Sequence, residues 1–183
     1  MGIPHYNHPL PRFPQLQNLM AFQDPPKVSL LMVCMGNICR SPTAEGVFRQ
    51  RLRDSGLDRH VRLDSAGTHA YHVGSPPDPR ARQAAAKRGY DLSDLVGRQV
   101  APRDFDEFDL LLAMDQDNLA NLKRICPPGR EDRVRLFLSF SQRYPHQEVP
   151  DPYYGGPLGF ERVLDMIEDA SEGLLDEIRR RLA

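Results

Sequence analysis

The sequence has no tryptophan, only three cysteines and no excess of charge of one sign. Three cysteines cannot all pair and show no framework spacing, which argues against a secreted disulfide-rich domain. The 24 lysines and arginines are offset by 25 aspartates and glutamates, so the basic excess typical of nucleic-acid-binding proteins is missing. We therefore expect no nucleic acid among the partners.

Long hydrophobic runs are also missing. No apolar stretch reaches the roughly 18 residues that a membrane-spanning helix needs. The N-terminus lacks the basic start and the apolar run of a secretory signal peptide. We therefore expect a cytoplasmic protein with no membrane partner. Its 183 residues suffice to bury a substantial core in one domain.

Prolines are concentrated at the start of the chain, where residues 1–26 hold six of the 17. Proline lacks a backbone donor and fixes its own φ, so neither a helix nor a central strand is expected there. We interpret this segment as an N-terminal extension that is flexible or lies on the surface. A docking arm is the alternative, because the segment contains Phe13, Leu16, Leu19, Met20 and Phe22. Residues 27–183 are predicted to form the folded domain.

Strand and helix patterns alternate after residue 27. A nearly continuous apolar run over 28–33 predicts a strand buried on both faces. Ser41 and Pro42 predict the N-cap and first position of a helix, and Gly56 its end. Further strands are predicted at 61–63, 108–113 and 134–138, and further helices at 79–88, 115–125 and from 160 onward. This alternation indicates an α/β fold in three layers, with a four-stranded parallel sheet covered by helices on both faces.

The segment between the first strand and the first helix carries the clearest chemical signal. It reads Cys34-Met35-Gly36-Asn37-Ile38-Cys39-Arg40-Ser41. A short loop between a strand and a helix N-terminus can turn successive N–H groups inward to bind phosphate oxygens. We expect Gly36 to supply a conformation forbidden to other residues, and Arg40 to bind two oxygens. This positive setting favours the thiolate of Cys34, which predicts a nucleophile.

The alternative is that Cys34 has only a structural role in the core, because free cysteine is often buried. Only Cys34 has an arginine six positions later; the same offset from Cys39 gives Glu45, and from Cys126 gives Asp132. Cys34 also follows a predicted buried strand, and this context favours the nucleophile. Both interpretations remain open for Cys39.

Asp151 is the candidate general acid. It lies between two prolines in the loop that follows the last predicted strand, and that loop leaves the same sheet edge as the Cys34 segment. Cleavage of a phosphate ester needs a proton for the leaving oxygen, which a carboxyl group can give. Tyr153 and Tyr154 follow directly and are suited to wall a cleft. An ordinary Asp-Pro turn explains the same residues equally well.

The run from Val33 to Glu45 resembles the loop of low-molecular-weight protein tyrosine phosphatases. Further blocks match in the family's order: Asp64-Ser65-Ala66-Gly67-Thr68, Gly74-Ser75-Pro76-Pro77-Asp78, Met114-Asp115-Gln116-Asp117-Asn118 and Asp151-Pro152-Tyr153-Tyr154-Gly155. The resemblance covers about residues 27–183. It implies a four-stranded parallel sheet, no metal or organic cofactor, and phosphotyrosine proteins as partners, with a tyrosine kinase as one candidate and inorganic phosphate as product.

The resemblance also implies roles for single residues. Cys34 attacks phosphotyrosine, Arg40 and the amides of the loop (Met35, Gly36, Asn37, Ile38, Cys39) hold the oxygens, and Asp151 serves as acid and then base. Ser41 assists the thiolate as a leaving group, and Asn37 braces the loop. Ile38, Tyr71, Tyr153 and Tyr154 line the pocket for the aryl ring. Cys39 forms a reversible disulfide with Cys34 as redox partner. Cys126 has no implied function.

Three alternatives remain. A phosphoarginine phosphatase has the same fold but carries threonine in place of Ile38, which favours tyrosine here. An arsenate reductase needs a further reactive cysteine pair, which Cys126 alone does not supply. A binding module without catalysis is disfavoured by the presence of Cys34, Arg40 and Asp151.

Overall fold

The computed structural model describes residues 25–145 and 147–183. Pro25 and Pro26 are exposed, and the rest of the predicted extension, residues 1–24, lies outside the described residues. In chain order the elements are β1 (Val28–Cys34), α1 (Arg40–Asp54), β2 (Val61–Gly67), α2 (Pro79–Lys87), α3 (Asp104–Glu107), β3 (Leu110–Ala113), α4 (Gln116–Ile125), β4 (Val134–Leu136) and α5 (Pro157–Leu182), with 3-10 helices at Glu131–Arg133 and Phe137–Phe140.

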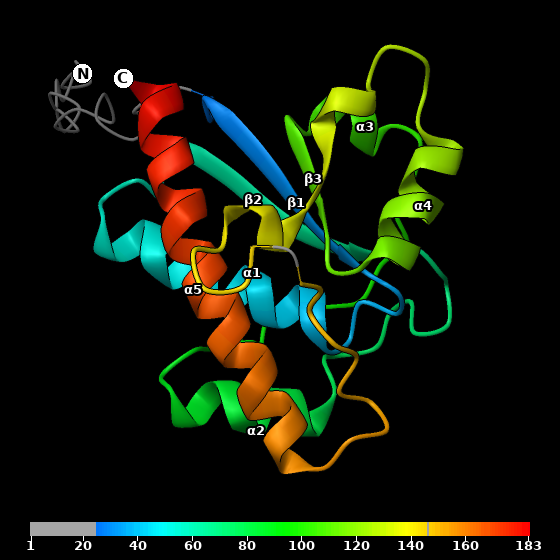
Figure 1. Cartoon of the computed structure of the whole chain (residues 1–183), viewed down its shortest axis with the longest axis vertical. Coiled ribbons are helices and arrows are strands. Elements are labelled where there is room, and N and C mark those ends of the chain that lie inside the picture. Colours follow the sequence, from blue (N-terminus) through cyan, green and yellow to red (C-terminus); the bar gives the residue numbers. More distant parts are fainter. Residues whose placement is uncertain (1–24, 146) are drawn as a thin grey trace, which may run out of the picture.

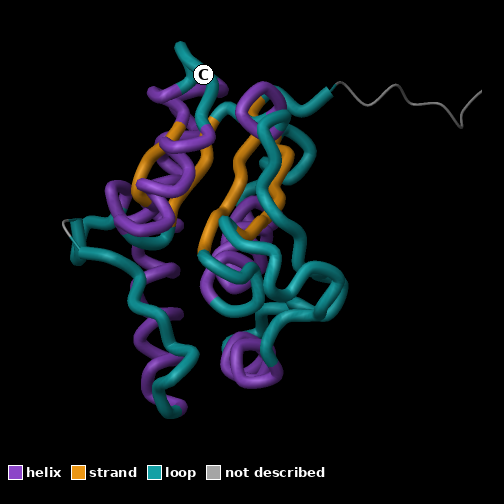
Figure 2. The backbone as a smooth tube through the Cα atoms, turned by 90° about the vertical axis from the view of Figure 1, so that its right-hand side faces the viewer, coloured by secondary structure: helices purple, strands orange, loops and turns teal. Residues whose placement is uncertain are grey.

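The four strands form one parallel sheet in the order β2-β1-β3-β4. The register pairs Cys34 with Gly67, Val33 with Ala113, and Ala113 with Leu136, so the strands end close to one level. Figure 2 shows the strands in the upper half of the molecule and loops gathered below them. The segments that follow the strands therefore meet at one edge of the sheet.

Alternating residues of β1 enter two different cores. Leu30 and Met32 pack on the face covered by α1, α2 and α5, whereas Leu31 and Val33 pack on the face of α3 and α4. Figure 1 shows α5 running along most of the molecule on one side of the sheet, with α4 on the other. The predicted three-layer fold with a four-stranded parallel sheet is confirmed.

Several predicted boundaries were wrong. Helix α1 begins at Arg40, its N-cap is Cys39, and the Ser41 side chain does not cap it. Strand β4 ends at Leu136 because residues 137–140 turn into a 3-10 helix, and the short helix α3 was not predicted. Strand β3 begins at Leu110 rather than Phe108, and β2 continues to Gly67.

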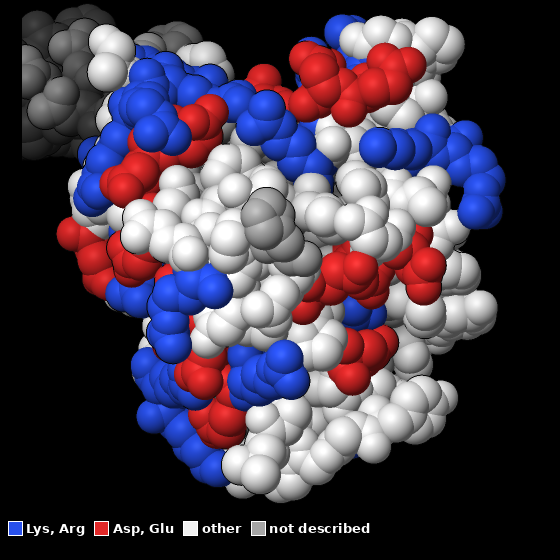
Figure 3. Space-filling model, in the orientation of Figure 1, with Lys and Arg blue, Asp and Glu red and all other residues white. Residues whose placement is uncertain are grey.

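The described part of the chain contains no helix long and apolar enough to cross a membrane. In Figure 3, Lys and Arg side chains are interspersed with Asp and Glu over the visible face. The lower right of that face, where Figure 1 places the loop before α5, is largely uncharged. Exposed Tyr153, Tyr154 and Leu158 belong to this part of the chain.

Helix α5 approaches the backbone of residues 137–140 closely at Gly173. A Cβ atom at this position would overlap the carbonyl oxygen of Phe140. We expect Gly173→Ala to lower the free energy of unfolding by about 1–3 kcal/mol, because overpacking forces the backbone to shift. Denaturant unfolding measures this quantity.

Gly159→Ala in the same helix is the matched control. Its Cβ would lie 3.7 Å from Pro152, an ordinary contact. The control is expected to be neutral or slightly stabilising, since alanine favours helix over glycine. An equal loss of stability in both variants would contradict the close-approach argument.

Candidate active site

Cys34 is the last residue of β1, and residues 34–40, here called the Cys34 loop, connect it to α1. The carbonyl of Cys34 accepts a hydrogen bond from the Thr68 amide at 2.9 Å, and that of Met35 accepts from the His69 amide at 3.0 Å. A Cβ at Gly67 would lie only 2.7 Å from the Met35 oxygen. Glycine at the end of β2 therefore allows the segment after β2 to hold the Cys34 loop closely.

The thiol of Cys34 is buried and has two polar neighbours. Its Sγ lies 3.0 Å from the Ser41 hydroxyl and accepts a hydrogen bond from the Asn37 amide at 3.3 Å. Ser41 lies in the first turn of α1 and turns its hydroxyl toward sulfur instead of capping the helix. Both contacts stabilise negative charge on the sulfur, because each group can donate to a thiolate.

Asn37 fixes the shape of the loop. It adopts a left-handed conformation with φ of 55°. Its side-chain Nδ2 donates to the hydroxyls of Ser41 and Ser65, both at 2.9 Å, and its side-chain Oδ1 accepts from the Arg98 backbone amide at 2.9 Å. The free energy of these hydrogen bonds offsets the strain of the left-handed backbone at Asn37.

The expected role of Gly36 was wrong in its mechanism. Gly36 is not among the residues with positive φ, and Asn37 takes the left-handed turn instead. A Cβ at Gly36 would lie 2.9 Å from the ring of His72. Glycine at this position makes room for that imidazole.

Arg40 is buried and binds acidic partners from two other segments. Its guanidinium donates to Asp115, to the carbonyl oxygen of Val149 at 3.2 Å, and to Asp151 at 2.9 Å. Its side chain is 3% exposed. Burial lowers the pKa of Arg40, but the charges of Cys34, Asp151 and Asp115 outweigh burial and raise it above its usual value. The guanidinium therefore stays charged.

Asp151 lies in the loop formed by residues 149–156, here called the Asp151 loop. Its side chain is 45% exposed, its Oδ2 accepts from Arg40, and its Oδ1 accepts from the Tyr153 amide at 3.0 Å. The loop places this carboxyl at the pocket that Cys34 and Arg40 also line. The structure thus brings the three predicted reactive side chains together.

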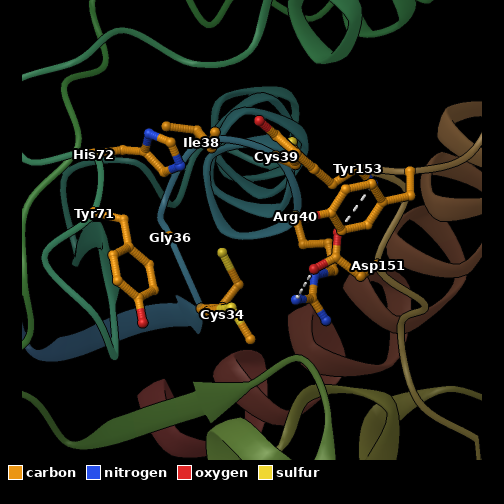
Figure 4. A pocket seen from close by; sticks show the side chains of 11 residues that line it. Cys34, Gly36, Ile38, Cys39, Arg40, Tyr71, His72, Asp151 and Tyr153 are labelled. Carbon is orange, nitrogen blue, oxygen red and sulfur yellow. Dashed lines mark hydrogen bonds and ion pairs between the residues drawn. The ribbon is translucent and has the colours of Figure 1, made fainter.

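The pocket has a volume of about 250 Å³. Figure 4 shows Tyr71 and His72 on one side of Cys34, and Arg40, Asp151 and Tyr153 on the other. The predicted residues that line it are Cys34, Met35, Gly36, Ile38, Cys39, Arg40, Tyr71, Asp151, Tyr153 and Tyr154. Asn37 and Ser41 are buried and do not line the pocket, but support the loop through the contacts above.

The three cysteines are free. Burial, followed by the charge of Asp78, raises the pKa of the Cys39 thiol to about 12, so this residue is a thiol at neutral pH. Burial also raises the pKa of Cys126. Cys126 follows α4 and lies outside the pocket.

Several residues around the site have roles that no sequence pattern predicted. Asp115 binds Arg40 and caps α4 through the Asn118 amide at 2.6 Å. Its place directly after β3, at the carboxyl edge of the sheet, was the available signal. His72, next to the predicted Tyr71, also lines the pocket. Among the described residues, no group of three His, Cys, Asp or Glu is arranged to hold a metal.

The fold and the site define an α/β protein with a tight cysteine-containing loop after its first parallel strand. Residues 29–183 match the family model described as low molecular weight phosphotyrosine protein phosphatase, and the chain belongs to this family. The predicted family resemblance is therefore confirmed.

Individual relatives agree with this assignment. The low molecular weight protein-tyrosine-phosphatase of Streptomyces coelicolor is 46% identical over 153 residues, covering 82% of this chain and 93% of that protein. The human low molecular weight phosphotyrosine protein phosphatase is 41% identical over 138 residues, covering 74% and 85%.

Solved structures are also similar. A protein tyrosine phosphatase from Entamoeba histolytica has a TM-score of 0.82 at 41% identity, covering 85% of this chain and 99% of that one. YfkJ from Bacillus subtilis has a TM-score of 0.78 at 35% identity, covering 84% and 95%.

Glu45 is a buried carboxyl in α1 whose titration is testable. Burial raises its pKa from 4.5 to about 7, with Asp64 adding to the rise, while a hydrogen bond with Ser65 and the charge of Arg49 oppose it. Between these pH values the folded protein holds a proton that the unfolded chain has lost. Stability therefore falls as the pH rises from 4.5 to about 7.

We expect Glu45→Gln to remove this fall, because glutamine never ionises. Above the upper pKa, the variant should be more stable than the parent by on the order of 3 kcal/mol, and the difference should shrink toward the lower pKa. Denaturant unfolding across this pH range measures it, with exposed Glu131→Gln as the control. A difference between Glu45→Gln and the parent that does not change with pH would refute the interpretation.

Proposed function

We propose that the protein hydrolyses phosphotyrosine in proteins through a phosphocysteine intermediate. The observation that supports this best is the convergence of Cys34, Arg40 and Asp151 on one pocket. Membership of a phosphotyrosine phosphatase family supports the substrate class. The pocket combines a nucleophile, a cation for the phosphoryl oxygens and a carboxyl for the leaving group.

The first step forms a bond between sulfur and phosphorus. The Cys34 thiolate, bonded to the Ser41 hydroxyl and the Asn37 amide, attacks phosphorus as the bond to the tyrosine oxygen breaks. Arg40 binds the phosphoryl oxygens, and its Nη2, which donates to Asp151 in the structure, becomes available to them. The negative charge of the phosphoryl group favours the neutral carboxyl, so Asp151 leaves Arg40, takes up a proton from solvent and gives that proton to the departing phenolate oxygen.

The second step releases phosphate. Asp151, now a carboxylate, takes a proton from a water molecule that attacks the phosphocysteine. The bond between phosphorus and sulfur breaks, and the thiolate returns to the hydrogen bonds of Ser41 and Asn37. These bonds make sulfur a better leaving group.

Aromatic side chains shape the mouth of the pocket for an aryl phosphate. Tyr153 lies edge-on to Tyr154 at 5.0 Å between ring centroids, and Tyr71 stacks on His69 at 5.1 Å. Tyr71, Tyr153 and Tyr154, together with Ile38, give an apolar wall suited to the phenyl ring of phosphotyrosine.

The proposed redox role of Cys39 is a disulfide with Cys34. The Cys39 thiol has a pKa of about 12, which limits this role. Cys39 would attack oxidised Cys34 as a thiolate, and the Cys39 thiolate is scarce at neutral pH. For substrates, we propose phosphotyrosine proteins in the cytoplasm. A tyrosine kinase is one candidate, on the basis of family kinship alone.

Two substitutions test the mechanism. Cys34→Ser should abolish turnover of p-nitrophenyl phosphate while the protein still binds inorganic phosphate. Asp151→Asn should lower kcat/KM for phosphotyrosine peptides by roughly 10²–10⁴-fold, the usual contribution of a general acid. Steady-state assays and a phosphate-binding titration measure these effects.

The controls are Cys126→Ser and Asp132→Asn, which lie outside the pocket. Both should retain the activity of the parent. A Cys34→Ser variant as active as the parent would contradict the assignment of Cys34 as nucleophile. If the parent protein binds phosphate but shows no turnover, the chain is a binding module instead.

Phosphoarginine is the alternative substrate, and Ile38 is the residue that favours phosphotyrosine over it. The parent should hydrolyse phosphotyrosine peptides at least tenfold faster than matched phosphoarginine peptides, because a tenfold preference requires only about 1.4 kcal/mol of discrimination by an apolar wall. Ile38→Thr should narrow this ratio. A parent that prefers phosphoarginine would overturn the substrate assignment.

A further inference from the structure

The Asp151 loop is attached to the rest of the protein on both sides of its carboxyl group. On the N-terminal side, the Val149 amide donates to the Met114 carbonyl at 2.9 Å, and Arg40 donates to the Val149 carbonyl at 3.2 Å. On the C-terminal side, Arg80 donates to the Tyr153 carbonyl at 2.9 Å. The carboxyl that faces the pocket is therefore held between two arginine-bound carbonyl groups.

Arg80 lies on α2, outside the set of residues that line the pocket. Its guanidinium also packs on aromatic rings: Cζ lies 5.3 Å from the ring centre of Tyr153 and 5.1 Å from that of Phe160. Phe160 is buried in α5, so one guanidinium joins the Asp151 loop to the helical layer. Such cation–π contacts favour one orientation of the cation over the ring.

Asp78 orients Arg80 and connects it to the Cys34 loop. Its carboxylate accepts from Nε at 3.0 Å and from Nη2 at 2.8 Å of Arg80, a two-point contact that fixes the plane of the guanidinium. The hydrogen bonds from Arg80 also lower the pKa of Asp78, so this partner remains charged. The Asp78 amide donates to the carbonyl of Ile38 at 2.8 Å.

A continuous set of contacts thus runs from one loop of the pocket to the other. It begins at Ile38 in the Cys34 loop, passes through Asp78 and Arg80, and reaches Tyr153, whose amide donates to Asp151 at 3.0 Å. We propose that Arg80, held by Asp78, is a positioning residue that sets the Asp151 carboxyl relative to the Cys34 nucleophile. This inference rests on the proposed function, in which Asp151 is the general acid.

The step that depends on this geometry is proton transfer to the leaving oxygen. A small displacement of an acid reduces its contribution to the rate without touching the nucleophile. The loss should therefore grow with the basicity of the leaving group, because a weakly basic phenolate departs without a proton. Damage to the Cys34 loop would instead slow all substrates alike.

The test compares two small aryl phosphates, which avoid contacts with a peptide. Phenyl phosphate releases phenol, whose pKa of about 10 matches tyrosine, and 2,4-dinitrophenyl phosphate releases a far stronger acid. Arg80→Ala is expected to lower kcat/KM for phenyl phosphate roughly tenfold and for the dinitrophenyl ester by about threefold or less. The Arg80 side chain is 47% exposed, so its truncation leaves the core intact.

A double-mutant cycle shows whether Arg80 acts through Asp151. Arg80→Ala should cause no further loss in the Asp151→Asn background. Arg82→Ala, a change of the same type on α2, is the matched control and should behave as the parent, since Arg82 lies outside the pocket and the contact set described above. A uniform loss on both esters, no loss at all, or an added loss in the Asp151→Asn background would each overturn the positioning role.

Failure of the acid assignment gives a different result. If Asp151→Asn alone slows both esters equally, Asp151 is not the general acid and the proposed function fails at that point, taking the positioning role with it. If Asp151→Asn selectively slows phenyl phosphate and Arg80→Ala does not, only the inference about Arg80 fails.

Discussion

The buried charge of Arg40 is the constraint on which the site depends. A guanidinium taken out of water costs several kcal/mol unless charged and polar groups surround it. Its partners are Asp115, which follows β3, and Val149 and Asp151, which belong to the loop before α5. These groups meet because the parallel strands end at one edge of the sheet. The fold therefore supplies partners for the buried charge of Arg40, and the same contacts bring the residues of the site together.

Features governed by local pattern were predictable from the sequence. The apolar run of β1, the spacing of apolar residues in α5 and the loop from Cys34 to Arg40 all depend on residues close together in the chain. Ser41 shows where local pattern fails: a Ser-Pro pair is a good N-cap signal, but a tertiary contact with the Cys34 sulfur determines its orientation. Asp115 and Arg80 were missed for a related reason, since their roles depend on which distant segments meet.

The Cys34 loop lies between β1 and α1 as predicted, but the predicted role of its glycine was wrong. Gly36 was expected to adopt a conformation forbidden to other residues, but Asn37 takes the left-handed conformation instead, and its side chain offsets the strain with three hydrogen bonds. The glycines at 36 and 67 serve close packing instead, against His72 and against the loop backbone. Sequence alone does not separate these two uses of glycine, because both require the absence of a Cβ.

In the proposed reaction, the contact between Asp151 and Arg40 has a consequence for the release of inorganic phosphate. The carboxylate is a tethered competitor: it is covalently attached beside the cation and so acts at a high effective concentration. Any free anion that enters the pocket must displace it, which weakens the retention of inorganic phosphate. A phosphoryl ester has an aryl group with which to offset that competition, whereas phosphate has none. In the proposed reaction, competition by the carboxylate therefore weakens the binding of ester and phosphate alike, and only the ester regains affinity through its aryl group.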